Sequence, residues 1–171
     1  MKKVVLVIFI ISIELCNIVG AIDENDLFQK REKELKEIGA HIRGAVLQHD
    51  VEKILKYIAN DGIPCNDSII PLNKVRKDLK DRNSWLYCYL FSAKKFEKIY
   101  KDVLYPMGLE RFFREASDVQ IDVSFMEIKG KKKSNYGCIR YKATNIEYAP
   151  EFCFFFENGK WTFTDSLYNC N

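Results

Sequence analysis

The chain contains little glycine and little proline, with 8 and 4 of these among its 171 residues. Such counts exclude a collagen-like or low-complexity chain, which is far richer in both. A mean hydropathy of −0.23 excludes a protein that crosses the membrane several times. Hydrophobic residues make up 47% and charged residues 30%, so disorder is excluded as the dominant state and a single globular domain is expected.

Histidine is scarce, and its two copies limit the chemistry that the sequence can support. His41 and His49 are eight residues apart, about two turns of a helix, which is too far for both to bind one metal ion. The sequence contains no C-x-x-C pair, no H-E-x-x-H, no glycine-rich phosphate loop and no recognisable Ser/His/Asp triad. We therefore predict no metal site and no cofactor, and assign no catalytic residue.

The first 21 residues have the pattern of a secretory signal peptide. Two lysines precede an apolar run over residues 4–11, and Glu14 interrupts any extension toward a membrane-spanning length. The small or modest-sized residues Val19, Gly20 and Ala21 predict cleavage after Ala21, which leaves a single domain over residues 22–171. An uncleaved anchor and a lipid anchor on Cys16 are the alternatives.

Export and a low net charge limit the partners that we expect. A cleaved signal peptide places the protein in the periplasm or outside the cell, with no stable membrane anchor after cleavage. The formal net charge of +3 is too small to indicate a nucleic-acid-binding protein. An unidentified small molecule or protein is the expected partner.

The first two thirds of the chain predict helices and a short hairpin. Residues 24–48 carry apolar side chains at helical spacing, and Asp50 is a suitable N-cap for a second helix up to residue 59. An extended edge hairpin is predicted over residues 63–72, turning at Asn66-Asp67. Further helices are expected from an N-cap at Asn73 through residue 79 and over residues 85–91, 96–103 and 109–116.

The last third changes to an alternating pattern and predicts four antiparallel strands. They are expected over residues 119–125, 136–143, 152–156 and 161–165, with a polar turn over residues 129–135. Asn158-Gly159 predicts a two-residue turn, which would place Phe154 opposite Phe163 and Phe156 opposite Trp161. The fold class is therefore α+β, with N-terminal helices packed on a curved antiparallel sheet and a short edge hairpin.

Five cysteines remain after cleavage, so one is left without a partner in the chain. If Arg140 lies opposite Glu151, then Cys138 lies opposite Cys153, and this register predicts a disulfide bond between them. Cys88 lies in the apolar stretch over residues 85–91, and we expect a buried, unreactive thiol there.

The order of elements resembles the cone-fold superfamily of nuclear-transport-factor-like and ketosteroid-isomerase-like proteins. The resemblance rests on AVLQHDVEKILKYIANDGI at residues 45–63 and NGKWTFTD at residues 158–165. It implies a curved sheet around a long first helix, although the extra helices over residues 83–117 depart from the pattern. In a cone fold the edge hairpin and the last strand can be neighbours, which implies a disulfide bond between Cys65 and Cys170. An unrelated α+β domain with a sheet on helices is the alternative.

A pocket lined by aromatic side chains is the candidate site. Apolar pockets with a few polar groups are the usual sites for small molecules. The candidate ligand-binding residues are Tyr57, Trp85, Tyr89, Tyr141, Trp161, Asp165 and His41.

Three functions remain open from the sequence. A binding or interaction domain without catalytic activity is the leading hypothesis. An isomerase- or dehydratase-like enzyme that uses Asp165 or His41 as its acid or base is the second, and an envelope protein without a pocket is the third. The lysines of residues 129–133 indicate either a solvated turn or a contact with anionic lipid or polysaccharide.

Overall fold

The computed structural model describes residues 23–100, 105–164 and 167. The chain divides into two compact units, residues 1–30 and 31–171, and the buried hydrophobic core of the described residues belongs to the second. The predicted signal peptide over residues 1–21 lies outside the described residues and stays a prediction. Of the helices described, none combines the length and the apolar character that a membrane span needs.

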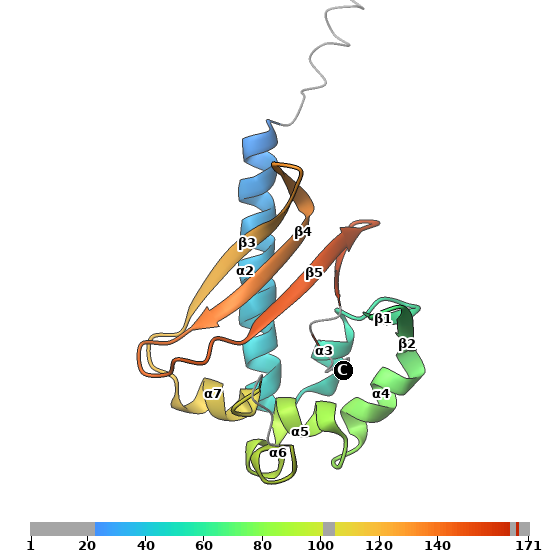
Figure 1. The fold of residues 1–171 in the computed structure, drawn as a ribbon, viewed down its shortest axis with the longest axis vertical. Helices are drawn as coiled ribbons and strands as arrows, with labels where there is room; N and C mark the ends of the chain where they lie inside the picture. The colour runs from blue at the N-terminus through green and yellow to red at the C-terminus, as the bar shows by residue number, and fades with distance from the viewer. Residues whose placement is uncertain (1–22, 101–104, 165–166, 168–171) are drawn as a thin grey trace, which may run out of the picture. The chain divides into compact units, whose positions relative to one another are not determined.

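The described residues form an α+β fold, as the sequence predicts. The helices are α2 (Glu24–Gln48), α3 (Val51–Leu55), α4 (Leu72–Lys80), α5 (Trp85–Phe91), α6 (Ala93–Ile99) and α7 (Leu109–Glu115). The strands are β1 (Gly62–Cys65), β2 (Ser68–Pro71), β3 (Gln120–Ile128), β4 (Lys131–Lys142), β5 (Glu151–Glu157) and β6 (Lys160–Phe163). Strands β1 and β2 form a separate hairpin, and the other four form an antiparallel sheet in chain order (Figure 1).

A side-chain cap fixes where the short helix α3 begins, whereas α4 begins without one. Asp50 accepts a hydrogen bond from the backbone N–H of Lys53 at the start of α3, as predicted. The cap predicted at Asn73 is wrong. Helix α4 begins one residue earlier, at Leu72, because β2 leads directly into it through the extended backbone of Pro71, and no side chain caps it.

The predicted register of the last two strands is confirmed. Asn158 and Gly159 both have positive φ, 52° and 80°, as a primed two-residue turn requires. Phe154 therefore lies opposite Phe163. Both rings are buried, whereas Phe155, on the other face of the same strand, is 38% exposed. One face of this hairpin is thus a wall of the core.

The turn between β3 and β4 is shorter than predicted. Lys129 and Gly130 have φ of 51° and 72°, and these two residues alone make the turn, so β4 already begins at Lys131. The polar turn expected over residues 129–135 is therefore wrong. Lys131 and Lys132 pair with Ile128 and Glu127 of β3, and the register is irregular after Phe125.

The disulfide predicted from strand register is present. Cys138 lies opposite Cys153, beside the pair Arg140 and Glu151, and the two sulfur atoms are bonded. Cys88 is a buried free thiol, as predicted, and burial raises the pKa of that thiol. Cys65 is also disulfide-bonded, but its predicted partner, Cys170, lies outside the described residues.

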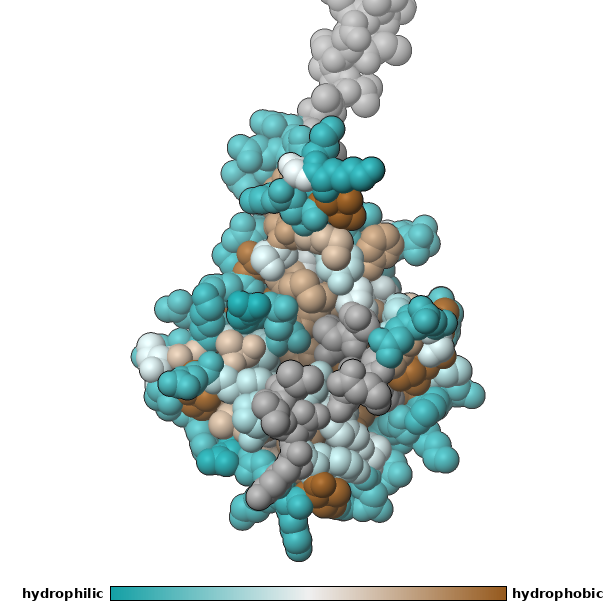
Figure 2. All heavy atoms as spheres, in the orientation of Figure 1, coloured by the Kyte–Doolittle hydropathy of each residue, from teal (hydrophilic) through white to brown (hydrophobic). Residues whose placement is uncertain are grey.

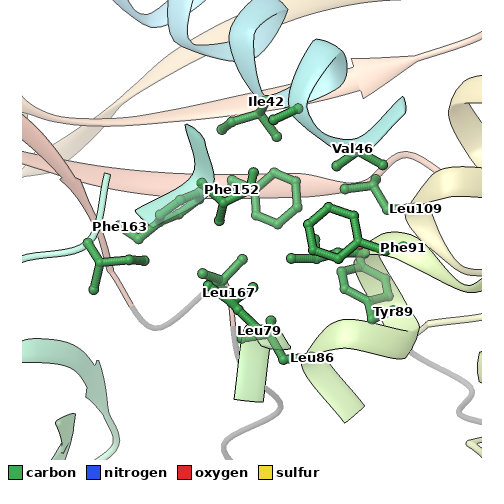
Figure 3. Packing of buried hydrophobic residues seen from close by; sticks show 14 of the residues in the cluster. Ile42, Val46, Leu79, Leu86, Tyr89, Phe91, Leu109, Phe152, Phe163 and Leu167 are labelled. Atoms are coloured by element: carbon green, nitrogen blue, oxygen red, sulfur yellow. The ribbon is translucent and has the colours of Figure 1, made fainter. Parts of the chain in front are cut away.

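The core lies where α2, the sheet and the short helices meet. Tyr141 of β4 donates its buried hydroxyl to the carbonyl oxygen of Gly39 at 2.8 Å, which joins the sheet to α2. Figure 3 shows Phe152 and Phe163 between Ile42 of α2 and the leucines of α4 and α5. On the face shown in Figure 2, hydrophobic side chains form only small, separate patches among hydrophilic ones.

Candidate functional site

An open hollow lies between α6 and α7, beside the end of α2, and we call it the α6–α7 hollow. Its volume is about 670 Å³, within the range of small-molecule sites. Phe91 and Ala93 supply buried apolar surface at its base. The other lining residues are polar or charged: His49, Ser92, Lys94, Glu97, Glu110, Arg111, Arg114 and Glu115.

Three hydrogen-bond partners hold the side chain of Glu110 in this hollow. One of its carboxylate oxygens accepts from Arg114 at 3.1 Å and lies 3.1 Å from Nε2 of His49. The other accepts from the backbone N–H of Ala93 at 3.4 Å. Burial by itself raises the pKa of Glu110, but the hydrogen bonds from His49, Arg114 and Ala93 outweigh burial and lower it. The carboxylate is therefore ionised at neutral pH.

Arg111 joins α7 to α6 across the same hollow. Its guanidinium donates to Glu115 at 2.9 Å and to Glu97 at 3.0 Å. These two carboxylates raise the pKa of Arg111, Glu115 contributing most. The second carboxylate oxygen of Glu97, Oε1, is buried and has no hydrogen-bond partner among the described residues. The three carboxylates of this hollow, Glu97, Glu110 and Glu115, are thus each paired with a basic side chain before any ligand binds.

A second, smaller hollow lies between α2 and β6, and we call it the α2–β6 hollow. It measures about 280 Å³ and includes His41, Tyr57 and Trp161 of the predicted pocket. The hydroxyl oxygen of Tyr57 lies 2.9 Å from Nδ1 of His41, and burial raises the pKa of Tyr57. The indole N–H of Trp161 donates to Glu34 at 2.8 Å.

The structure does not bring all of the predicted pocket residues together. Trp85 and Tyr89 stack on each other in the helical part of the core, with ring centroids 5.0 Å apart. Tyr89 and Tyr141 are buried, and their hydroxyls bind Tyr148 and the Gly39 carbonyl rather than facing either hollow. Asp165 lies outside the described residues.

Sequence reasoning missed the residues that line the larger hollow. The spacing of four residues from Glu110 to Arg114 and from Arg111 to Glu115 is a visible signal for ion pairs along α7. The bonds that link α7 to Glu97 and to His49 span 14 and 61 residues, and no local pattern indicates them.

Cys138, Glu151 and Cys153 are the residues of metal-binding type that gather within the described ranges. Their potential ligand atoms lie within 4.8 Å of one another. The disulfide bond occupies both sulfur atoms, and Glu151 forms an ion pair with Arg140 at 2.7 Å. Because a metal ion needs free thiolates, this trio serves a structural purpose.

Comparison with protein-family models, with curated proteins and with solved structures found no match to this chain.

Proposed function

We propose that this chain is an exported ligand-binding domain that acts without catalysis, and that its ligand occupies the α6–α7 hollow. The observation that carries the proposal is one open space of about 670 Å³ that combines an apolar base with three carboxylates already paired with arginines. An apolar surface with a few fixed polar groups is the usual composition of a small-molecule site.

The charge balance of the lining indicates the class of ligand. Three basic side chains and three carboxylates line the hollow: Lys94, Arg111, Arg114, Glu97, Glu110 and Glu115. With no excess of either sign, the hollow favours an uncharged or zwitterionic molecule. The ring of Phe91 and the methyl group of Ala93 would contact its apolar part, and the rim would contact its polar groups.

The ion pairs favour binding over acid–base chemistry at this site. A carboxylate with a lowered pKa, such as Glu110, is a weak general base near neutral pH. Side chains already held in place lose little conformational entropy when a ligand binds, which favours affinity. Glu110 is held by His49 just after α2, by Ala93 of α6 and by Arg114 of its own helix.

A neutral, environment-sensitive dye, N-phenyl-1-naphthylamine, tests this proposal. We expect saturable binding to the full chain, with a fluorescence increase that Lys94→Phe greatly reduces because the new ring fills the hollow. Lys98→Phe is the matched control, since Lys98 is an exposed lysine of the same helix that does not line the hollow. Equal unfolding midpoints in urea would show that both variants are folded.

Two results would overturn the proposal. One is the absence of saturable dye binding to the wild-type chain, and the other is equal binding by Lys94→Phe and Lys98→Phe. Loss of binding in Tyr57→Phe rather than in Lys94→Phe would move the site to the α2–β6 hollow, where Tyr57 lies.

Acid–base catalysis in the α2–β6 hollow is a second candidate function, favoured by the contact between His41 and Tyr57. Histidine exchanges protons near neutral pH, and the raised pKa of Tyr57 keeps its hydroxyl protonated as a hydrogen-bond donor. This candidate function is the one that the resemblance to isomerase-like cone folds implies. The test is deuterium uptake from D₂O by an apolar ketone, at the carbon atom beside its carbonyl group. Uptake that His41→Gln abolishes would support catalysis, and no uptake with the wild-type chain would contradict it.

A further inference from the structure

The end of the β3–β4 hairpin combines exposed apolar and basic side chains. Met126 and Ile128 are 41% and 47% exposed, two of the five large hydrophobic side chains that are exposed among the described residues. Four lysines accompany them within eight residues of sequence: Lys129, Lys131, Lys132 and Lys133. All four lysines are exposed, and Glu127 is the one acidic residue of the stretch.

Strand pairing places the two kinds of side chain together. Ile128 lies directly opposite Lys131 in the antiparallel register, and such partners share one face of a hairpin. The turn at Lys129-Gly130 is open, because a Cβ added to Gly130 would meet no atom within 4 Å. Within the described residues, no carboxylate forms an ion pair with any of the four lysines.

We propose that this hairpin end docks reversibly on an anionic lipid bilayer. The lysines attract the negatively charged surface, and Met126 and Ile128 enter the boundary between headgroups and acyl chains. Basic residues near an anionic leaflet each strengthen binding, and apolar side chains between them add a term that does not depend on salt. A soluble anionic polysaccharide would use the lysines but would gain nothing from the exposed Met126 and Ile128. The observations therefore favour the bilayer.

The test places a fluorescent reporter at the proposed contact. In full-length Ile128→Trp, we expect the emission to shift to shorter wavelength with vesicles of phosphatidylcholine and phosphatidylglycerol, and not with phosphatidylcholine alone. Ile69→Trp is the matched control, because Ile69 is an exposed isoleucine of the separate β1–β2 hairpin. The native Trp85 and Trp161 emit in both variants, so the difference between Ile128→Trp and Ile69→Trp reports lipid contact at residue 128. This difference also separates docking of the hairpin from any insertion of the N-terminal apolar run.

The lysines are tested in the same Ile128→Trp background. Replacing Lys129, Lys131 and Lys132 by Gln should weaken vesicle binding about a hundredfold, because each lysine contributes about fivefold. Raising the salt concentration should also weaken binding. Lys56, Lys77 and Lys98 replaced by Gln form a charge-matched control, since these are exposed lysines on other elements.

Three outcomes would overturn the proposal. The first is no change in Ile128→Trp emission with anionic vesicles, which would indicate a solvated turn. The second is an equal loss of binding in both triple-lysine variants, which would show that only net charge matters. The third is a response to dextran sulfate without a response to vesicles, which would identify a polysaccharide as the partner.

Discussion

The hydroxyl of Tyr141 reaches the carbonyl oxygen of Gly39 across the interface between β4 and α2, at 2.8 Å. The contact depends on the absence of a side chain at Gly39. A Cβ built there would lie 3.0 Å from a methyl group of Ile121 and 3.3 Å from one of Ile139. Helix and sheet therefore approach each other closely at this glycine, and a buried hydrogen bond joins them at that point.

Alanine substitutions at two glycines of α2 should have opposite effects. Gly44→Ala should stabilise the fold by about 0.5–1 kcal/mol, because a Cβ there meets nothing within 4 Å and alanine favours a helix. Gly39→Ala should be less stable than Gly44→Ala by at least about 1 kcal/mol, because the isoleucines must move. Urea unfolding measures both, and equal free energies of unfolding would contradict the close approach.

Adjacent phenylalanines of β5 should differ strongly in their effect on stability. Phe154→Ala removes a fully buried ring and should lower the free energy of unfolding by about 3–5 kcal/mol. Phe155→Ala is the control on the opposite face, where the ring is 38% exposed, and should cost less than about 1 kcal/mol. The reverse order in denaturant unfolding would mean that the register is displaced by one residue.

Alkaline pH should destabilise the protein through its buried tyrosines. Burial raises the pKa of Tyr148 to about 12, although its hydrogen bond with Tyr89 acts in the opposite direction. Burial also raises the pKa of Tyr89 and of Tyr141 well above 10.0. The unfolded chain therefore loses these protons at lower pH than the folded chain does.

The resulting stability is fully present below pH 10 and should be lost as the pH rises toward 12. Tyrosinate absorbance during a pH titration measures the effect. At least three of the nine tyrosines should stay protonated in the folded protein near pH 11. This pH lies between the ordinary tyrosine pKa of 10.0 and the pKa of about 12 of Tyr148. Complete ionisation of all nine by pH 10 in folded protein would refute the assignment.

Removing the disulfide between Cys138 and Cys153 should lower stability by about 3 kcal/mol. The bond closes a loop of 15 residues, and the chain-entropy model assigns about this amount to such a loop. The double variant Cys138→Ala/Cys153→Ala, unfolded in urea, measures the loss. An unchanged midpoint would show that the bond does not restrict the unfolded chain.

Peptide mapping without reduction would test the complete disulfide pattern. Cys65 is disulfide-bonded, and we expect its partner to be Cys170. Cys88 should resist alkylation in the folded protein because its thiol is buried and has a raised pKa. Recovery of Cys88 in any bridged peptide would contradict this pattern, and a bridge between Cys65 and Cys16 would contradict cleavage at Ala21.

Local patterns were enough to predict most elements and the register of two strand pairs. The alternation of apolar residues identified the strands, and the two-residue turn at Asn158-Gly159 aligned Phe154 with Phe163. A charge pair and a cysteine pair independently aligned β4 with β5. These predictions succeed because backbone periodicity and turn geometry act over a few residues.

The sequence by itself therefore determined the α+β class, the helix boundaries to within a few residues, and the pairing of Cys138 with Cys153. Only the tertiary structure decided which side chains share a hollow. His49, Glu97 and Glu110 share a hollow because the residue after α2 reaches α7, which packs against α6. Tyr89 and Tyr141 do not line the predicted pocket because both are buried in the core. Periodicity assigns a residue to a face of its own element, whereas a site depends on how faces from distant elements meet, and long-range packing alone sets that.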